Sequence, residues 1–106
     1  MVEQPTISTH VLDAEFGRPM VGVVVSLHRL GGGSAEAVGG GLTDDDGRIG
    51  RLIDGPLETG SYRLEFTVGG PFFETISISF RVDDESRSYH VPLLLAPYSL
   101  TTYRGS

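Results

Sequence analysis

The chain has 106 residues, with 14 acidic side chains against 8 basic ones and a formal net charge of −6 at pH 7. This charge argues against a nucleic-acid binder, which needs a basic face, and against attachment to an anionic membrane surface. Cysteine is absent and every basic residue is arginine, which excludes disulfides, thiolate catalysis and Schiff-base chemistry on lysine. Any catalysis must use His, Arg, Ser, Thr, Tyr, carboxylates or the backbone.

The length predicts a single domain over residues 1–106, and the hydrophobic content of 39% is ordinary for a globular chain. No apolar run approaches the ~20 residues of a membrane-spanning helix. The segment Met1–Pro5 lacks the basic and apolar regions of a signal peptide. We therefore expect a cytoplasmic protein.

Alternation of apolar and polar residues predicts β-strands along most of the chain. It is regular over residues 21–29, 62–68 and 76–82, and weaker over 6–12, 89–95 and 100–103. Turn signals separate these segments at residues 15–19, 31–34, 43–48, 54–56 and 69–71. No segment of ten residues shows a convincing helical period. The pattern predicts an all-β fold, a two-sheet antiparallel β-sandwich of seven or eight strands.

Two features suggest a functional site, but each has a simpler structural interpretation. Asp44-Asp45-Asp46-Gly47 suggests a calcium loop, but the alternating ligands, the final Glu and the flanking helices of an EF-hand are missing. A solvated acidic turn is the better interpretation. His28 stands alone on the polar face of a predicted strand, as an ordinary surface or interface histidine does.

His10, His90 and the final residues are stronger candidates. Each histidine lies on the strand face opposite its apolar neighbours, and His90 comes two residues before a proline that strands tolerate only at an edge or bulge. Tyr103–Ser106 follows a strand-like segment, so it either fixes an Arg, a hydroxyl and a carboxylate at one place or frays from an edge strand. Composition alone leaves a catalytic role open.

Four motifs occur in one order along nearly the whole chain. They are Ser8–Asp13 with Gly17–Pro19, Asp46–Arg48, Tyr89–Leu95 and Tyr103–Ser106. Together they resemble the 5-hydroxyisourate hydrolases, transthyretin-like enzymes of purine degradation. The terminal Tyr-Arg-Gly-Ser makes the resemblance specific, since hormone-carrying transthyretins lack it.

The resemblance implies a transthyretin-like sandwich assembled as a homotetramer, a dimer of dimers with active sites at the dimer–dimer interface. It implies a cyclic amide hydrolase that converts 5-hydroxyisourate to 2-oxo-4-hydroxy-4-carboxy-5-ureidoimidazoline in urate degradation, without cofactor or metal. Carried over by motif, the catalytic residues are His10, Arg48 and His90. The implied substrate-binding residues are Tyr103, Arg104, Gly105 and Ser106.

This hydrolysis needs a positioned water, a base with a pKa near neutrality, and cationic donors for the developing oxyanion. We expect one of His10 and His90 to activate the water and the other to orient the substrate or protonate the leaving nitrogen. Arg48 would stabilise the oxyanion, and the Ser106 hydroxyl or terminal carboxylate would fix substrate or water. A zinc site on the histidines is disfavoured because further ligands are too few.

The chain departs from the family pattern at two places. Gly69–Pro71 leads almost directly into Phe72–Glu74, where the family usually has a longer connection with a short helix, so we expect that helix to be reduced or absent. Ser99–Thr101 replaces a common Gly-Tyr-Ser, which could alter tetramer contacts or substrate packing. Neither change removes a catalytic motif.

Two alternatives to an enzyme remain at this point. One is a non-enzymatic transthyretin-like carrier, which the polar set of histidines and arginine disfavours because an apolar ligand gains nothing from buried charge. The other is a structural sandwich domain of a cell-surface protein, which the missing signal peptide disfavours.

Overall fold

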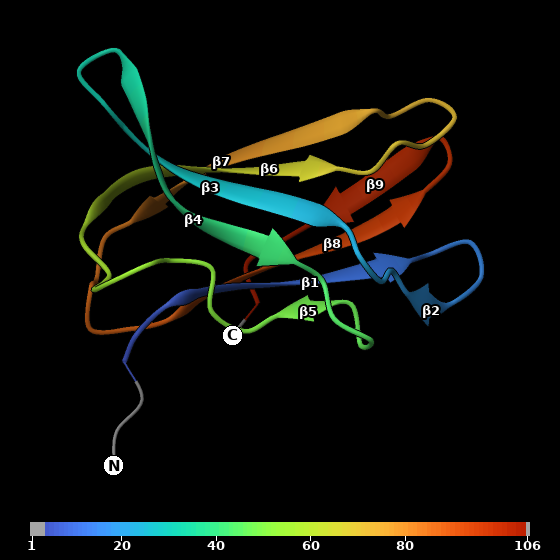
Figure 1. The fold of residues 1–106 in the computed structure, drawn as a ribbon, viewed down its shortest axis with the longest axis horizontal. Coiled ribbons are helices and arrows are strands. Elements are labelled where there is room, and N and C mark those ends of the chain that lie inside the picture. Colours follow the sequence, from blue (N-terminus) through green and yellow to red (C-terminus); the bar gives the residue numbers. More distant parts are fainter. Residues whose placement is uncertain (1–3, 106) are drawn as a thin grey trace.

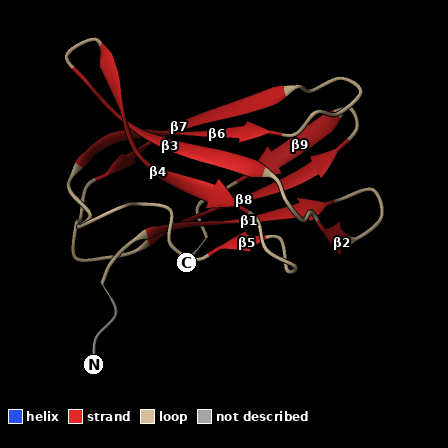
Figure 2. Ribbon diagram, viewed as in Figure 1, coloured by secondary structure: helices blue, strands red, loops and turns tan. Residues whose placement is uncertain are grey.

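The computed structural model describes residues 4–105, which fold as two β-sheets packed face to face (Figures 1 and 2). One sheet has the order β2-β1-β8-β9 with β5 paired to β1, and the other has the order β4-β3-β6-β7. The strands are β1 (Ile7–Asp13), β2 (Arg18–Pro19), β3 (Val24–Gly31), β4 (Ser34–Leu42), β5 (Arg48–Ile49), β6 (Gly60–Thr67), β7 (Thr75–Val82), β8 (Tyr89–Ala96) and β9 (Ser99–Thr102). The predicted all-β sandwich is confirmed.

The strand count and one pairing differ from the prediction. Residues 4–105 form nine strands rather than seven or eight, because two of them, β2 and β5, are only two residues long; β2 pairs with the end of β1 and β5 with its middle. β1 also pairs with β8 in parallel, whereas the other strand pairs are antiparallel. Alternation within a strand reports which faces are buried, not the direction of the neighbouring strand.

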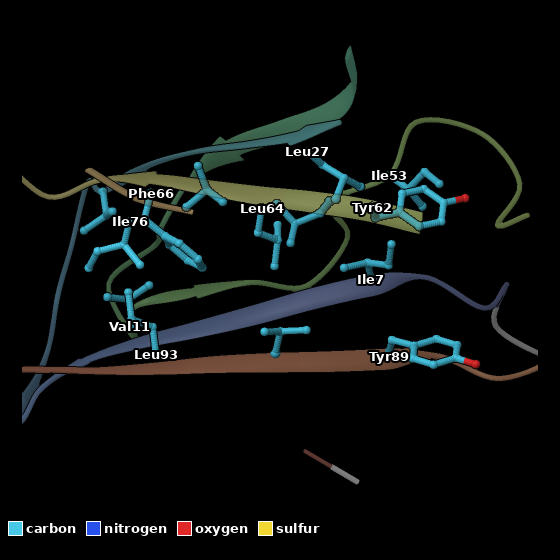
Figure 3. Close-up of a cluster of buried hydrophobic side chains, with 14 of the residues drawn as sticks. Ile7, Val11, Leu27, Ile53, Tyr62, Leu64, Phe66, Ile76, Tyr89 and Leu93 are labelled. Atoms are coloured by element: carbon cyan, nitrogen blue, oxygen red, sulfur yellow. The ribbon is translucent and has the colours of Figure 1, made fainter. Parts of the chain in front are cut away.

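The predicted faces are confirmed in the core between the sheets (Figure 3). Leu27 of β3, Leu64 and Phe66 of β6, and Leu93 of β8 are fully buried. Each such side chain contributes about 1.5–3 kcal/mol through burial of apolar surface. The other faces of both sheets therefore carry the polar residues that alternate with the core.

One predicted strand begins too early. The prediction started this strand at Val21, which is 60% exposed, whereas β3 begins at Val24. Gly22 lies in the left-handed region with φ +76°, which belongs to a turn. The Thr43 hydroxyl holds this turn, accepting a hydrogen bond from the Val23 N–H at 2.9 Å.

β4 has little β-propensity in its sequence, and alternation marked no strand there, although a hairpin tip was predicted at residues 31–34. Its glycines are required by a close backbone approach: a Cβ at residue 39 would lie 1.7 Å from the Leu52 carbonyl oxygen. Gly40 donates a backbone hydrogen bond to the same oxygen at 2.8 Å. The segment before β6 therefore covers part of the exposed edge of β4.

The connection from β6 to β7 is a tight turn. Gly70 donates to the Phe73 carbonyl at 2.9 Å, and Val68 donates to the Glu74 carbonyl at 3.0 Å. Gly69 has φ +58°, which suits glycine. Residues 4–105 contain no helix, in agreement with the prediction that the connecting helix is reduced or absent, and hence none long and apolar enough to span a membrane.

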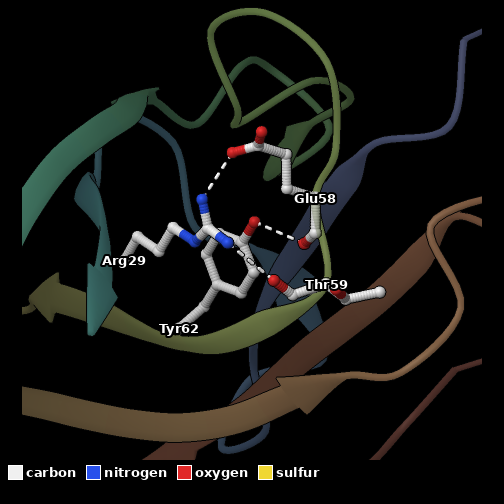
Figure 4. Close-up of polar contacts among 4 residues, drawn as sticks. All are labelled: Arg29, Glu58, Thr59 and Tyr62. Atoms are coloured by element: carbon white, nitrogen blue, oxygen red, sulfur yellow. Dashed lines mark hydrogen bonds and ion pairs between the residues drawn. The ribbon is translucent and has the colours of Figure 1, made fainter. Parts of the chain in front are cut away.

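Polar contacts fix the long connection that enters β6 (Figure 4). Arg29 of β3 forms an ion pair with Glu58 and donates to the Thr59 carbonyl at 2.7 Å. The buried Tyr62 donates its hydroxyl hydrogen to the Glu58 carbonyl at 2.6 Å. This connection is thereby tied to the four-stranded sheet, away from the predicted catalytic residues.

Candidate active site

The strand register brings the three predicted catalytic residues onto one face of the five-stranded sheet. His10 of β1 is opposite Arg48 of β5 on one side and Pro92 of β8 on the other, and Ser8 of β1 is opposite His90 of β8. The intervening residues, such as the buried Thr9 and Val11, point into the core. The two histidines and Arg48 therefore share the outer face.

The turn before β5 positions Arg48. The Asp44 carboxylate accepts hydrogen bonds from the backbone N–H groups of Asp46 and Arg48, each at 2.9 Å. These bonds, that to Arg48 foremost, lower the pKa of Asp44 and keep it ionised. Gly47, with φ +76°, docks the turn on β1 by accepting from the Val11 N–H at 2.7 Å. The acidic run is thus a structural turn that presents Arg48.

The same turn orients His10. Its Nε2 lies 2.7 Å from the Asp46 carbonyl oxygen. A carbonyl only accepts, so Nε2 carries the hydrogen and donates it. In the neutral ring the free lone pair is then on Nδ1.

His90 is held by Ser8, whose Oγ lies 2.8 Å from His90 Nδ1. Partial burial lowers the pKa of His90, and the nearby Arg48 guanidinium and His10 ring lower it further. His90 is therefore neutral near pH 7 and can accept a proton. Sequence reasoning did not single out Ser8, although its place two residues before His10 on the same strand already put it on the same face.

The C-terminal segment lies against His90. Gly105 is paired with His90 and donates its N–H to the His90 carbonyl at 2.8 Å. This segment continues the register of β9, where Thr102 is opposite Leu93. Tyr103 and Gly105 therefore share the outer face with His90, and Arg104 is on the inner face. Ser106 lies outside the described residues.

Other candidates lie elsewhere. His28 is on the four-stranded sheet, opposite Arg63 of β6. Within residues 4–105, no three His, Asp or Glu side chains converge as metal ligands would.

The site face combines two imidazoles, a guanidinium and a hydroxyl on a rigid sheet. Such a set can activate a water, orient a carbonyl and stabilise an oxyanion with no other group. The fold and the site thus define a β-sandwich protein whose outer face carries side chains suited to hydrolysis.

The chain belongs to the HIUase/Transthyretin family, whose model matches residues 7–105. It is 40% identical to a 5-hydroxyisourate hydrolase of Deinococcus radiodurans, with 100% of each chain covered. It is also 43% identical to the uric acid degradation bifunctional protein TTL of Arabidopsis thaliana, over 97% of this chain but 38% of the plant protein.

Solved structures agree with this family. The structure of Klebsiella pneumoniae 5-hydroxyisourate hydrolase matches with a TM-score of 0.83 at 37% identity, covering 95% of this chain and 99% of that one. Sea bream transthyretin, solved in complex with thyroxine, also matches with a TM-score of 0.83, at 30% identity and with 93% of each chain covered. The fold is therefore transthyretin-like.

Proposed function

We propose that this chain hydrolyses 5-hydroxyisourate to 2-oxo-4-hydroxy-4-carboxy-5-ureidoimidazoline, opening the six-membered ring at a lactam amide in urate degradation in the cytoplasm. The observation that supports this most directly is the common sheet face of His10, Arg48 and His90. The Deinococcus radiodurans relative named 5-hydroxyisourate hydrolase adds to it, because the match to this chain covers its full length.

In this mechanism His90 is the general base. Its lowered pKa keeps the imidazole neutral. This role requires the tautomer in which His90 Nδ1 donates its hydrogen to Ser8 Oγ, so that the Nε2 lone pair is free to remove a proton from water. The water oxygen then attacks the lactam carbonyl carbon.

Arg48 stabilises the negative charge that develops on the carbonyl oxygen. Its guanidinium is permanently charged and planar, which suits a substrate with several carbonyl oxygens. As the carbon–nitrogen bond breaks, the proton held by His90 passes to the leaving nitrogen. His10, fixed through Nε2 by the Asp46 carbonyl, orients the substrate.

The C-terminal segment completes the site in this proposal. Tyr103 would contact the substrate on the outer face of the sheet, and Gly105 brings the C-terminal backbone close to His90. The Ser106 hydroxyl or carboxylate would hold substrate or water. These roles give Tyr-Arg-Gly-Ser a chemical purpose that a carrier does not need.

The assembly that fits this site is a homotetramer, a dimer of dimers with the sites at the dimer–dimer interface. Arg48 and Tyr103 are exposed on an open sheet face in the single chain. Exclusion of bulk water strengthens electrostatic catalysis, so a second copy facing this sheet would improve the site. Light scattering tests the assembly: active protein with the 11.4 kDa mass of one chain would contradict it.

The activity is tested by following the ultraviolet absorbance of freshly generated 5-hydroxyisourate. We expect the chain to accelerate its decay, and His90→Ala and Arg48→Ala to reduce kcat/KM by about 10²-fold or more. His28→Ala is the matched control, because this histidine is on the other sheet. Folded His10→Ala, Arg48→Ala and His90→Ala variants with full activity would refute the assignment.

A carrier of apolar ligands is the second candidate, suggested by the likeness to a transthyretin solved with thyroxine. It predicts tight binding of an aromatic ligand and no acceleration of 5-hydroxyisourate decay. The histidines and Arg48 on the outer face favour hydrolysis, because an apolar ligand would leave them desolvated and unpaired. The same absorbance assay separates the two functions.

A further inference from the structure

Arg104 lies on the opposite side of the sheet from the two histidines. Its Cζ atom is 4.5 Å from the centroid of the Tyr89 ring, a cation–π distance. Tyr89 is 3% exposed and points inward, whereas its neighbour His90 points outward. Arg104 and Tyr89 also line a cavity of about 210 Å³ at the edge of the sandwich. Strand β8 therefore separates the guanidinium from the His90 imidazole.

Hydrogen bonds fix the Tyr89 ring, which forms the binding surface for the Arg104 guanidinium. The Tyr89 hydroxyl donates to the Asp83 carboxylate at 2.7 Å and accepts the Asp84 N–H at 2.9 Å. The Tyr89 hydrogen bond is the main cause of the lowered pKa of Asp83, and the Arg104 charge lowers it further. The ring and the acidic turn together present a fixed face with negative charge beside it.

The backbone next to Arg104 touches His90 on the catalytic side. A Cβ built on Gly105 would lie 2.6 Å from His90 Cδ2 and 3.2 Å from His90 Cγ, so the glycine backbone lies too close to the imidazole for any side chain to fit between them. The backbone ladder is weakened just before this point, because Pro92 has no N–H to donate to Tyr103. One backbone hydrogen bond, from Gly105 to His90, closes the ladder beyond the gap.

We propose that Arg104 is a positioning residue. Its cation–π contact with Tyr89, on the far side of the sheet, holds Gly105 against the His90 imidazole. The side chain acts across the strand through two adjacent pairs, Arg104 on Tyr89 and Gly105 on His90. It fixes the ring of the base and shields it from water without touching substrate. The catalytic part of this proposal rests on the proposed function, whereas the contact between the tail and His90 does not.

The proposal predicts a change in the free protein. Without the Arg104 side chain, the C-terminal segment loses its contact with Tyr89. Gly105 then moves away from the His90 imidazole, and His90 becomes more exposed. Burial is the main cause of the lowered His90 pKa, so exposure raises that pKa toward its ordinary value. Ser8, Arg48 and His10 also face or reach His90, and they stay in place when Arg104 is replaced.

The test is an NMR titration of the imidazole carbons in the full chain without substrate. The three histidines give three sets of signals, and His28 serves as an internal reference on the other sheet. In Arg104→Gln we expect the His90 signals to shift and their midpoint to rise, while those of His28 stay unchanged. Arg87→Gln is the matched control, since it removes an equal charge from the β7–β8 turn without losing a ring contact.

Two further variants keep the proposal falsifiable if Arg104→Gln folds poorly. Arg104→Lys keeps the charge but loses the planar stack, so it should give a smaller shift of the same sign. Gly105→Ala places a methyl group against the ring and should move the His90 signals with Arg104 intact. His90 signals that stay unchanged in both variants would overturn the proposal.

Kinetics separate positioning from substrate binding. We expect Arg104→Gln to lower kcat on the order of 10²-fold, the effect of a displacement near 1 Å at the base. The proposal would be overturned if Arg104→Gln raised only KM and its His90 signals without substrate were the same as in the parent protein. Arg104 would then be a substrate contact. If no variant hydrolyses 5-hydroxyisourate but the His90 signals move as expected, the proposed function fails and the positioning contact stands.

Discussion

Gly47→Ala should damage both the fold and the site, because this glycine docks the turn that presents Arg48 on β1. A Cβ at residue 47 would lie 2.4 Å from the Val11 carbonyl oxygen, and φ is +76°. An alanine in the left-handed region costs about 1–2 kcal/mol. The methyl group must also move by roughly 1 Å to reach an ordinary contact distance. That shift weakens the Val11–Gly47 hydrogen bond, a further loss of about 0.5–1.5 kcal/mol.

Gly22→Ala separates these effects. Gly22 has the same φ of +76°, but its Cβ would meet nothing within 4 Å. We expect Gly22→Ala to cost about 1–2 kcal/mol with near-parental activity. Gly47→Ala should cost about 2–4 kcal/mol and reduce kcat/KM on the order of 10²-fold, because Arg48 moves with the turn.

Urea unfolding followed by tyrosine fluorescence measures the stabilities, and decay of 5-hydroxyisourate absorbance measures the activities. Equal losses of stability and activity in the two variants would refute the steric argument. It would then be the backbone strain, and not the contact with β1, that matters at Gly47.

Four other predictions rest on contacts described above. Ser8→Ala should lower kcat roughly fivefold, because about 1 kcal/mol of hydrogen bonding to His90 is lost. Ser8→Thr should retain more activity. Equal kcat values for Ser8→Ala and the parent protein would contradict this prediction. The His90 pKa is lowered, so the unfolded chain binds this proton more readily, and stability should fall as the pH drops below about 6.5. Arg48→Gln removes a nearby positive charge and should raise the His90 midpoint in an NMR titration, whereas an unchanged or lower midpoint would be inconsistent with this cause. Gly39→Ala should destabilise the fold by about 3 kcal/mol or more in urea unfolding, while Gly31→Ala, with open space around it, should lose much less.

The sequence predicts the sheet faces well because a strand has a period of two. Alternation identifies Leu64 and Phe66 as core residues, and both are fully buried. The same period puts Ser8 and His10 on one face of β1. Motif resemblance supplied His90 and Arg48, and the strand register brings both onto that face.

Other features depend on contacts between distant segments. β4 forms although its glycines disfavour a strand, because only glycine allows the backbone of Leu52 so close to residue 39. The side on which Arg104 lies follows from the register across Pro92, which local propensity does not report. The Asp46 carbonyl that holds His10 is a backbone group, invisible in a pattern of side chains.

The alternation of site and core residues on β1 and β8 restricts how chain length can change. A shift of one residue in either strand would turn its histidine into the core and expose a buried valine, Val11 or Val91. An insertion or deletion inside these strands would thus disrupt both the proposed catalytic face and the hydrophobic core. The turn over residues 68–74 joins two strands of the other sheet, so its length can vary without moving any of the proposed catalytic side chains. A change of length in this turn should therefore leave the arrangement of His10, Arg48 and His90 intact.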